Sequence, residues 1–153
     1  MKSRLQSSFE LLMTLAFGLA ILTPLVLVAF LQLSNATLSL TSIESQQAAN
    51  KLASIATLVG SQGPPAKQLV QIQVPSGVQY IYIGSSSNNI GHEVIFVVRS
   101  PTGQSYITSY TPANISGNLG GLVTQGTYLI NVSSVSNCPT NAYLGCVFMS
   151  PAI

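Results

Sequence analysis

One uncharged apolar run near the N-terminus restricts the fold more than any other feature of the chain. Residues 11–31 read LLMTLAFGLAILTPLVLVAFL, 21 residues without a charged side chain. As an α-helix this run is about 31 Å long at roughly 1.5 Å per residue, enough to cross the hydrocarbon core of a bilayer. It exceeds the roughly 7–15 apolar residues of a cleaved secretory signal, and no A-x-A site follows it. The run therefore predicts a transmembrane helix that stays in the mature chain.

The few charges of the chain indicate the orientation of this helix. Lys2 and Arg4 precede the run, and the next basic residue is Lys51. The positive-inside bias places the N-terminus in the cytoplasm and everything after Leu33 outside. Charged residues are only 5% of the sequence, so Ser, Thr, Asn and Gln must supply most of the polar surface. Five basic residues that form no stripe cannot neutralise a phosphate backbone, which argues against nucleic-acid binding.

A short motif stands at the entrance to the apolar run. The sequence RLQSSFE at residues 4–10, followed by two leucines, resembles the class III signal peptide of archaeal prepilins. In that family a membrane peptidase cuts before the Gln, and the mature type IV pilins polymerise through their N-terminal helices. The resemblance implies a leader over residues 1–5, cleavage between Leu5 and Gln6, and assembly into a helical homopolymer. It also implies a prepilin peptidase and a membrane assembly machinery as partners. Leu5 departs from the family pattern, which usually has Gly there.

Glu10 is a carboxylate at the edge of the apolar run, and two interpretations of it stay open. It could be an interfacial acid in the first helical turn, where the helix dipole favours negative charge. Alternatively it needs a partner once the helix is buried, because isolated charge in an apolar medium is costly. Cleavage before Gln6 creates an α-amine that could pair with Glu10 of a neighbouring helix and set the stagger of the two. Pro24, which lacks an N–H donor, predicts a kink or a locally melted turn.

The helix is expected to continue beyond the membrane to about residue 60. Apolar residues recur there at near-helical spacing, with Ile43 out of phase. These residues are Leu38, Ala48, Leu52, Ile55 and Val59. Gly60, Gly63 and the pair Pro64-Pro65 then stop the helix. The predicted organisation is a leader over 1–5, a helix over 6–60, a linker over 61–68 and a β-domain over 69–153.

The second half of the chain predicts a small antiparallel β-sandwich. β-branched and aromatic residues dominate from Leu69 onward, and turn residues interrupt them at short intervals. Seven strands are expected, over residues 68–74, 78–84, 93–99, 105–111, 115–119, 126–132 and 143–149. The tyrosines fall in this half, and we interpret most of them as half-buried strand residues. The predicted fold class is α+β, a long N-terminal transmembrane or filament-core helix followed by the sandwich.

Two cysteines and three sequons concern an exported chain. Cys138 and Cys146 predict a disulfide that closes a short loop if the domain lies outside the cell. Their spacing does not match a CxxC redox or zinc motif, so no metal site is expected. Three Asn-x-Ser/Thr triplets are possible N-glycan acceptors, and no other cofactor is expected. The acceptor residues are Asn35, Asn114 and Asn131.

The sequence offers little support for catalysis. His92 and Glu93 are the only neighbouring His and carboxylate, and adjacent strand residues point to opposite faces. Because the chain contains no Asp, it holds no Ser-His-Asp set. We therefore expect a non-enzymatic structural subunit that is inserted in the membrane as a precursor and then assembled into an extracellular filament for adhesion. A minor pilin, or an uncleaved signal-anchored surface binding protein, are the alternatives.

Overall fold

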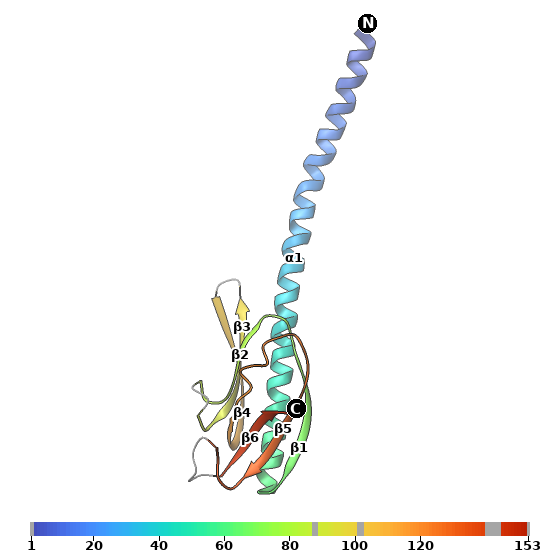
Figure 1. Ribbon diagram of the computed structural model, residues 1–153. Helices are drawn as coiled ribbons and strands as arrows, with labels where there is room; N and C mark the ends of the chain where they lie inside the picture. Colours follow the sequence, from blue (N-terminus) through green and yellow to red (C-terminus); the bar gives the residue numbers. More distant parts are fainter. Residues whose placement is uncertain (1, 87–88, 101–102, 140–144, 153) are drawn as a thin grey trace. The chain divides into compact units, whose positions relative to one another are not determined.

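The computed structural model contains one long helix followed by six strands (Figure 1). It describes residues 2–86, 89–100, 103–139 and 145–152, with side chains from residue 8 onward. The chain divides into two compact units, Met1–Ser39 and Leu40–Ile153, which are treated separately below. The expected α+β class with a long N-terminal helix is confirmed. The elements are α1 (Lys2–Gln62), β1 (Lys67–Val74), β2 (Val78–Gly84), β3 (Gly91–Ser100), β4 (Gly103–Gly117), β5 (Gly126–Val135) and β6 (Cys146–Pro151).

Helix α1 ends at a glycine and not at the prolines that follow. Gly63 has a φ of 71°, a left-handed conformation that costs Gly least, and its N–H donates to the carbonyl of Gly60 at 3.3 Å. Strand β1 begins at Lys67, so the connection covers only residues 63–66 and is shorter than the predicted linker.

In its N-terminal half, α1 runs through Pro24 with helical backbone on both sides, so the structure contains no melted turn there.

The six strands form one mixed sheet in the order β1-β5-β6-β4-β3-β2. Neighbouring strands are antiparallel except β4 and β6, which run parallel where residues 115–117 meet residues 147–149. The predicted antiparallel sandwich is therefore not found among the described residues, which build a single sheet. The physical reason is that helix α1 covers the apolar face of the sheet, so a second sheet is not needed to bury it.

Strand β4 joins two segments that the sequence pattern separates. Residues 105–111 and 115–119 were predicted as two strands, whereas β4 extends without interruption from Gly103 to Gly117. Its first part pairs with β3 without a break as far as Tyr110, and after a register shift Ile115 pairs with Gly91 of β3. Its last three residues pair with β6 on the other side. Pro112 lies between these two pairings, where its missing N–H removes no ladder bond. The predicted strand at 143–149 begins at Cys146 in the structure, and residues 143–144 lie outside the described residues.

The core of the second unit lies between α1 and one face of the sheet. The helix contributes mostly small side chains, which allow its backbone to approach the sheet closely, together with the fully buried Leu52. Alternate residues of β3 meet it with larger side chains, of which Phe96 is fully buried. Of the apolar residues that recur at helical spacing, Ala48, Leu52 and Val59 are buried and Leu38 and Ile55 are half-buried, whereas the out-of-phase Ile43 is exposed. The buried helix residues are Ser45, Ala48, Ala49, Leu52, Ala53, Ala56 and Val59.

Candidate assembly surface on the N-terminal helix

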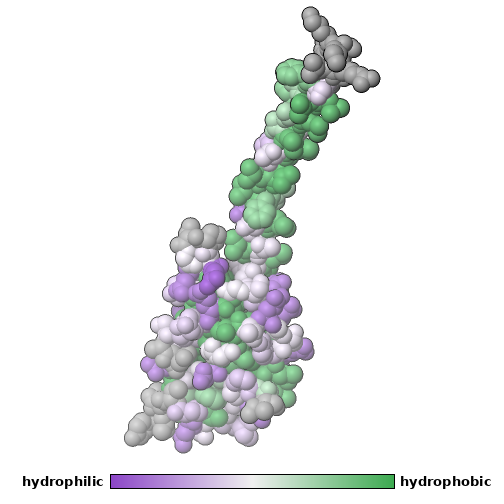
Figure 2. All heavy atoms as spheres, turned by 45° about the horizontal axis from the view of Figure 1, so that its top comes forward, coloured by the Kyte–Doolittle hydropathy of each residue, from purple (hydrophilic) through white to green (hydrophobic). Residues whose placement is uncertain are grey.

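The first unit exposes a continuous apolar surface. Every large apolar side chain from Phe9 to Leu33 is exposed, from 52% at Val28 to 70% at Phe17 and Phe30. Figure 2 shows these apolar side chains on the surface of the helical segment. The residues are Phe9, Leu11, Leu12, Met13, Leu15, Phe17, Leu19, Ile21, Leu22, Leu25, Val26, Leu27, Val28, Phe30, Leu31 and Leu33. A helix that is apolar all round requires an apolar environment, either lipid or other protein.

The hydroxyl groups within this segment are satisfied by the helix itself. Thr14 Oγ1 donates to the carbonyls of Glu10 at 3.1 Å and Leu11 at 2.9 Å. Thr23 Oγ1 donates to the carbonyl of Leu19 at 2.7 Å. Such bonds to the preceding turn remove the penalty for placing a hydroxyl in an apolar medium. The two threonines are therefore compatible with burial of the segment in lipid or among other helices.

Glycine 18 makes one face of the segment shallower than the rest. A methyl group at Gly18 would meet no atom within 4 Å, and a shallow groove surrounds this position. The groove is lined by Thr14, Leu15, Gly18, Leu19 and Leu22. Small residues of this kind allow a second apolar helix to approach closely. The face is a suitable contact for another helix within lipid or within a polymer.

Glu10 is the one charged residue of the segment 8–33. Its side chain is exposed at the start of the apolar surface. The predicted cleavage site, Leu5–Gln6, lies in the helical backbone of α1, and the side chains of both residues lie outside the described ones. In the sequence, Glu10 thus follows the predicted new N-terminus by four residues, and the pairing of the two groups between copies stays a prediction.

Length and composition make α1 compatible with a membrane anchor. From Ser8 onward it is the one helix of the described residues that is long and apolar enough to cross a bilayer, and the most apolar part of it is unburied. The helix therefore agrees with one part of the predicted location, namely a membrane anchor near the N-terminus.

The three sequons differ in exposure. Asn35 is exposed on α1, whereas Asn114 and Asn131 are half-buried in strands β4 and β5. The Oδ1 atom of Asn131 is buried and has no hydrogen-bond partner among the described residues. Asn114 lines a hollow of about 360 Å³ beside Gly60 at the end of α1. Of the three acceptors, Asn35 is thus the one whose side chain is openly accessible in the folded chain.

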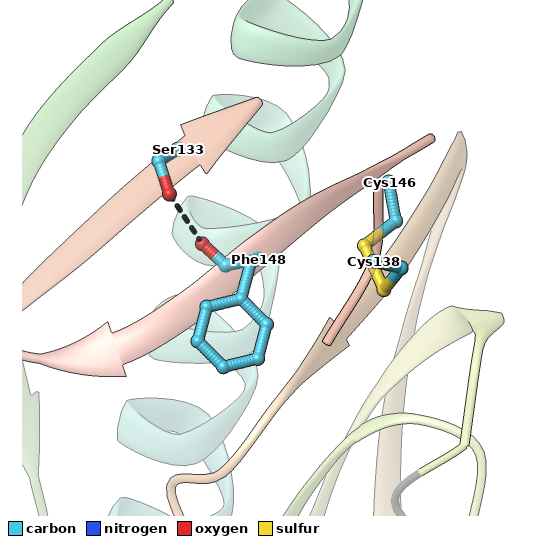
Figure 3. The surroundings of a disulfide bond; sticks show 4 residues. All are labelled: Ser133, Cys138, Cys146 and Phe148. Atoms are coloured by element: carbon cyan, nitrogen blue, oxygen red, sulfur yellow. Dashed lines mark hydrogen bonds between the residues drawn. A yellow bond between two sulfur atoms is a disulfide. The ribbon is translucent and has the colours of Figure 1, made fainter. Parts of the chain in front are cut away.

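The structure contains a disulfide between Cys138 and Cys146 (Figure 3). The Cα atoms of the two residues are 5.4 Å apart, within the usual range for such bonds. The bond ties the segment after β5 to Cys146, the first residue of β6. Cys146 also pairs with Val135 of β5 in the antiparallel ladder. Nearby, the hydroxyl of Ser133 donates to the carbonyl of Phe148 at 3.5 Å.

The described residues contain no group of three or more His, Cys, Asp and Glu side chains that could hold a metal ion. His92 Nδ1 lies 3.0 Å from the carbonyl oxygen of Ala113, and its ring is tilted against that of Tyr110. His92 thus has structural neighbours in the sheet. Sequence reasoning missed helix side chains that bind strand carbonyls, such as Lys51, whose Nζ donates to the carbonyl of Gln71 at 2.8 Å. The interpretation of most tyrosines as half-buried is wrong, because Tyr80, Tyr106 and Tyr110 are exposed on the strands of the sheet.

Comparison with known proteins gives no family for this chain. No family model matches it, and no curated protein or solved structure is detectably similar to it.

Proposed function

We propose that this chain is the structural subunit of an archaeal type IV pilus-like filament that polymerises through its N-terminal helix. The observation that carries the proposal is the exposed apolar surface of residues 9–33 on a helix whose later part is built into a β-domain. Such a surface needs lipid before assembly and like helices after it. The motif at residues 4–10 supports the same function, because it resembles the processing site of archaeal prepilins.

The energetic argument is that one surface suits two successive environments. Apolar surface removed from water contributes roughly 25 cal/mol per Å², whether lipid or protein covers it. Transfer from a bilayer into a bundle of like helices therefore loses little hydrophobic stabilisation, and close packing at Gly18 adds contacts that lipid makes less well. Glu10 fits such a bundle only if a cation meets it there. The α-amine of Gln6 after cleavage is that cation.

The proposal includes the processing and location of the chain. A membrane peptidase cuts between Leu5 and Gln6, the helix holds the subunit in the membrane, and an assembly machinery moves it into a filament on the cell surface. Removal of Lys2 and Arg4 leaves three basic and three acidic side chains, so many copies can stack without net repulsion. The filament displays the uncharged polar surface of the β-domain, which suits adhesion.

The test combines mass spectrometry of the mature chain with electron microscopy of material sheared from the cell surface. The expected result is a mature N-terminus at Gln6 and fibres that contain this chain. An intact N-terminus in the membrane fraction without fibres supports the alternative of a single-span anchored surface protein. A few copies within fibres built from another chain support a minor pilin. A mature chain that begins after Leu33 contradicts the proposal.

A further inference from the structure

The outer face of strands β2, β3 and β4 carries a cluster of tyrosines. Along each strand, residues that alternate with the buried ones line the face opposite the core. Tyr80, Tyr106 and Tyr110 are 51%, 63% and 68% exposed, and Tyr82 is half-buried. We call these four residues the tyrosine face. Exposed aromatic side chains in such a group exceed what a solvated sheet face needs, which points to an interaction surface.

Two apolar side chains of β3 form the floor of the tyrosine face. Ile95 is 7% and Val97 2% exposed, although both lie outside the core cluster on the other side of the sheet. Val97 is directly opposite Tyr80 on one side and Tyr106 on the other. Ile95 is opposite Tyr82. Cross-strand neighbours on one face are in reach of one another, so the rings lean over β3 and cover it.

The tyrosine face is held by its own contacts and is nearly free of charge. The rings of Tyr80 and Tyr82 stack with their centroids 6.0 Å apart. Beside them Gln104 Nε2 donates to Gln79 Oε1 at 2.7 Å. The charged residues of the three strands are one Glu and one Arg, both on β3, so the face has no net charge. Rigid aromatic contact area of this kind loses little conformational entropy on binding.

A second exposed apolar patch lies at the other end of the strand order. Leu69 of β1 and Leu129 of β5 are 57% and 47% exposed and alternate with core residues, so they share the outer face of the sheet. Gln71 is directly opposite Leu129. Gln71 also lines a hollow of about 240 Å³ along β1, together with Lys51. We call Leu69, Gln71 and Leu129 the leucine patch.

We propose that the tyrosine face of one copy packs on the leucine patch of the next copy, so that neighbouring β-domains contact each other head to tail along the filament. This inference rests on the proposed filament function. Aromatic rings meet aliphatic side chains in this contact. Because the two patches are different, the contact is heterologous, which is the type of contact that can continue from copy to copy in an open filament.

A second copy fits these observations better than other occupants do. Nucleic acid or an anionic polymer requires a cluster of positive charge, and the tyrosine face has a single Arg beside it. A neutral polysaccharide could stack on the rings, but it would leave the leucine patch exposed and unexplained. In a head-to-tail array the two neighbours of a copy together cover both of its patches, because each copy supplies one patch of each kind.

Chemical cross-linking in the full chain tests the contact directly. Thr108 lies on β4 between Tyr106 and Tyr110, and Gln71 lies in the leucine patch; both side chains are exposed. A Thr108→Cys, Gln71→Cys double variant is treated with a bismaleimide on sheared fibres and on membranes. The described residues contain no free cysteine, so the reagent reacts at the introduced sites. The matched control is Thr108→Cys with Ser76→Cys, an exposed turn position outside both patches.

The expected result is a ladder of dimers, trimers and longer products from the double variant, and no ladder from the control or from either single variant. Dimers from Thr108→Cys alone would show a face-to-face contact and overturn the proposal, as would a double variant without products. The same ladder from membranes without fibres would support the contact while contradicting the filament function. Fibres that give no ladder would support the filament function and contradict the proposed contact.

A second variant tests the energetic role of the rings. Replacing Tyr80, Tyr106 and Tyr110 together by Ser should lower the yield of intact fibres after shearing by at least about tenfold, since aromatic residues are frequent interface anchors. Leu40→Ser serves as the control because Leu40 is 57% exposed on the helix, outside both patches. Unchanged fibres would overturn the proposal. Loss of binding to a neutral polysaccharide such as mannan, with fibres intact, would assign the face to carbohydrate instead.

Discussion

Two parts of the same helix differ in how they are buried. From Phe9 to Leu33 large apolar side chains surround α1 on all sides, and all of them are exposed. From Ser45 to Val59 the apolar residues are mostly Ala, and all of them except Leu58 lie on one face that packs against the sheet. A helix with a single apolar stripe is completed by its own domain, whereas one that is apolar all round must be completed by lipid or by other chains. The comparison predicts that substitutions in the first part change membrane insertion and assembly, whereas substitutions in the second part change the stability of the β-domain.

The largest effect is expected from a charge in the first part. Leu22→Arg places a cation near the middle of the apolar run, which costs about 2.5–3.5 kcal/mol at the centre of a membrane span. We expect loss of the chain from both the membrane and the fibre fractions, measured by immunoblotting. Ser54→Arg, on the exposed side of the second part, is the control and should change neither fraction. Normal fibres from Leu22→Arg would refute the assigned role of the segment.

Truncation of the second part should act on folding instead. Leu52→Ala removes a fully buried side chain and should lower the free energy of unfolding of the β-domain by about 2–5 kcal/mol. Thermal or denaturant unfolding of the detergent-solubilised chain measures this change. Leu40→Ala is the matched control, since Leu40 is 57% exposed, and should stay within about 0.5 kcal/mol of the wild type. Equal effects of both variants would contradict the packing described here.

The disulfide should stabilise the second unit by an amount in the lower part of that range. Its loop is short, with a sequence separation of 8, for which the chain-entropy model gives about 2.5 kcal/mol. The double variant Cys138→Ser, Cys146→Ser should lose about this much unfolding free energy. A reducing agent should have the same effect on the wild type and none on the variant. If a reducing agent also lowered the unfolding free energy of the variant, the effect would not come from this disulfide and the prediction would be contradicted.

The smallest expected effect comes from the carboxylate at the start of the first part. Glu10→Ala should leave cleavage at Gln6 intact and lower the fibre yield by roughly several-fold, because the α-amine of a neighbour loses its partner. Glu44→Ala is the control, since Glu44 is an exposed carboxylate on the same helix in the second unit. Mass spectrometry reports cleavage and electron microscopy reports fibres. Wild-type fibre yield from Glu10→Ala would exclude the pairing.

Sequence reasoning was most accurate where local chemistry decides. The helix, its end near Gly63 and the strands at 78–84 and 126–132 follow from periodicity and from turn residues close in sequence. It failed where distant segments compete for the same position. The antiparallel sandwich was wrong because the choice between a second sheet and a helix as the covering layer depends on packing across the domain. Similarly, nothing local reveals that Ile115 pairs in parallel with Val147.

The sequence by itself determined the apolar segment and the position of Glu10 at its edge, because these depend on the order of side chains along one helix. Only the tertiary structure decided that helix α1 forms the second layer of the domain. It also decided that tyrosines from β2 and β4 lie on one face, with Leu69 and Leu129 at the other end of the sheet order. The physical reason is that strand pairing brings together residues far apart in sequence, and the free energy of that pairing is a property of the whole sheet.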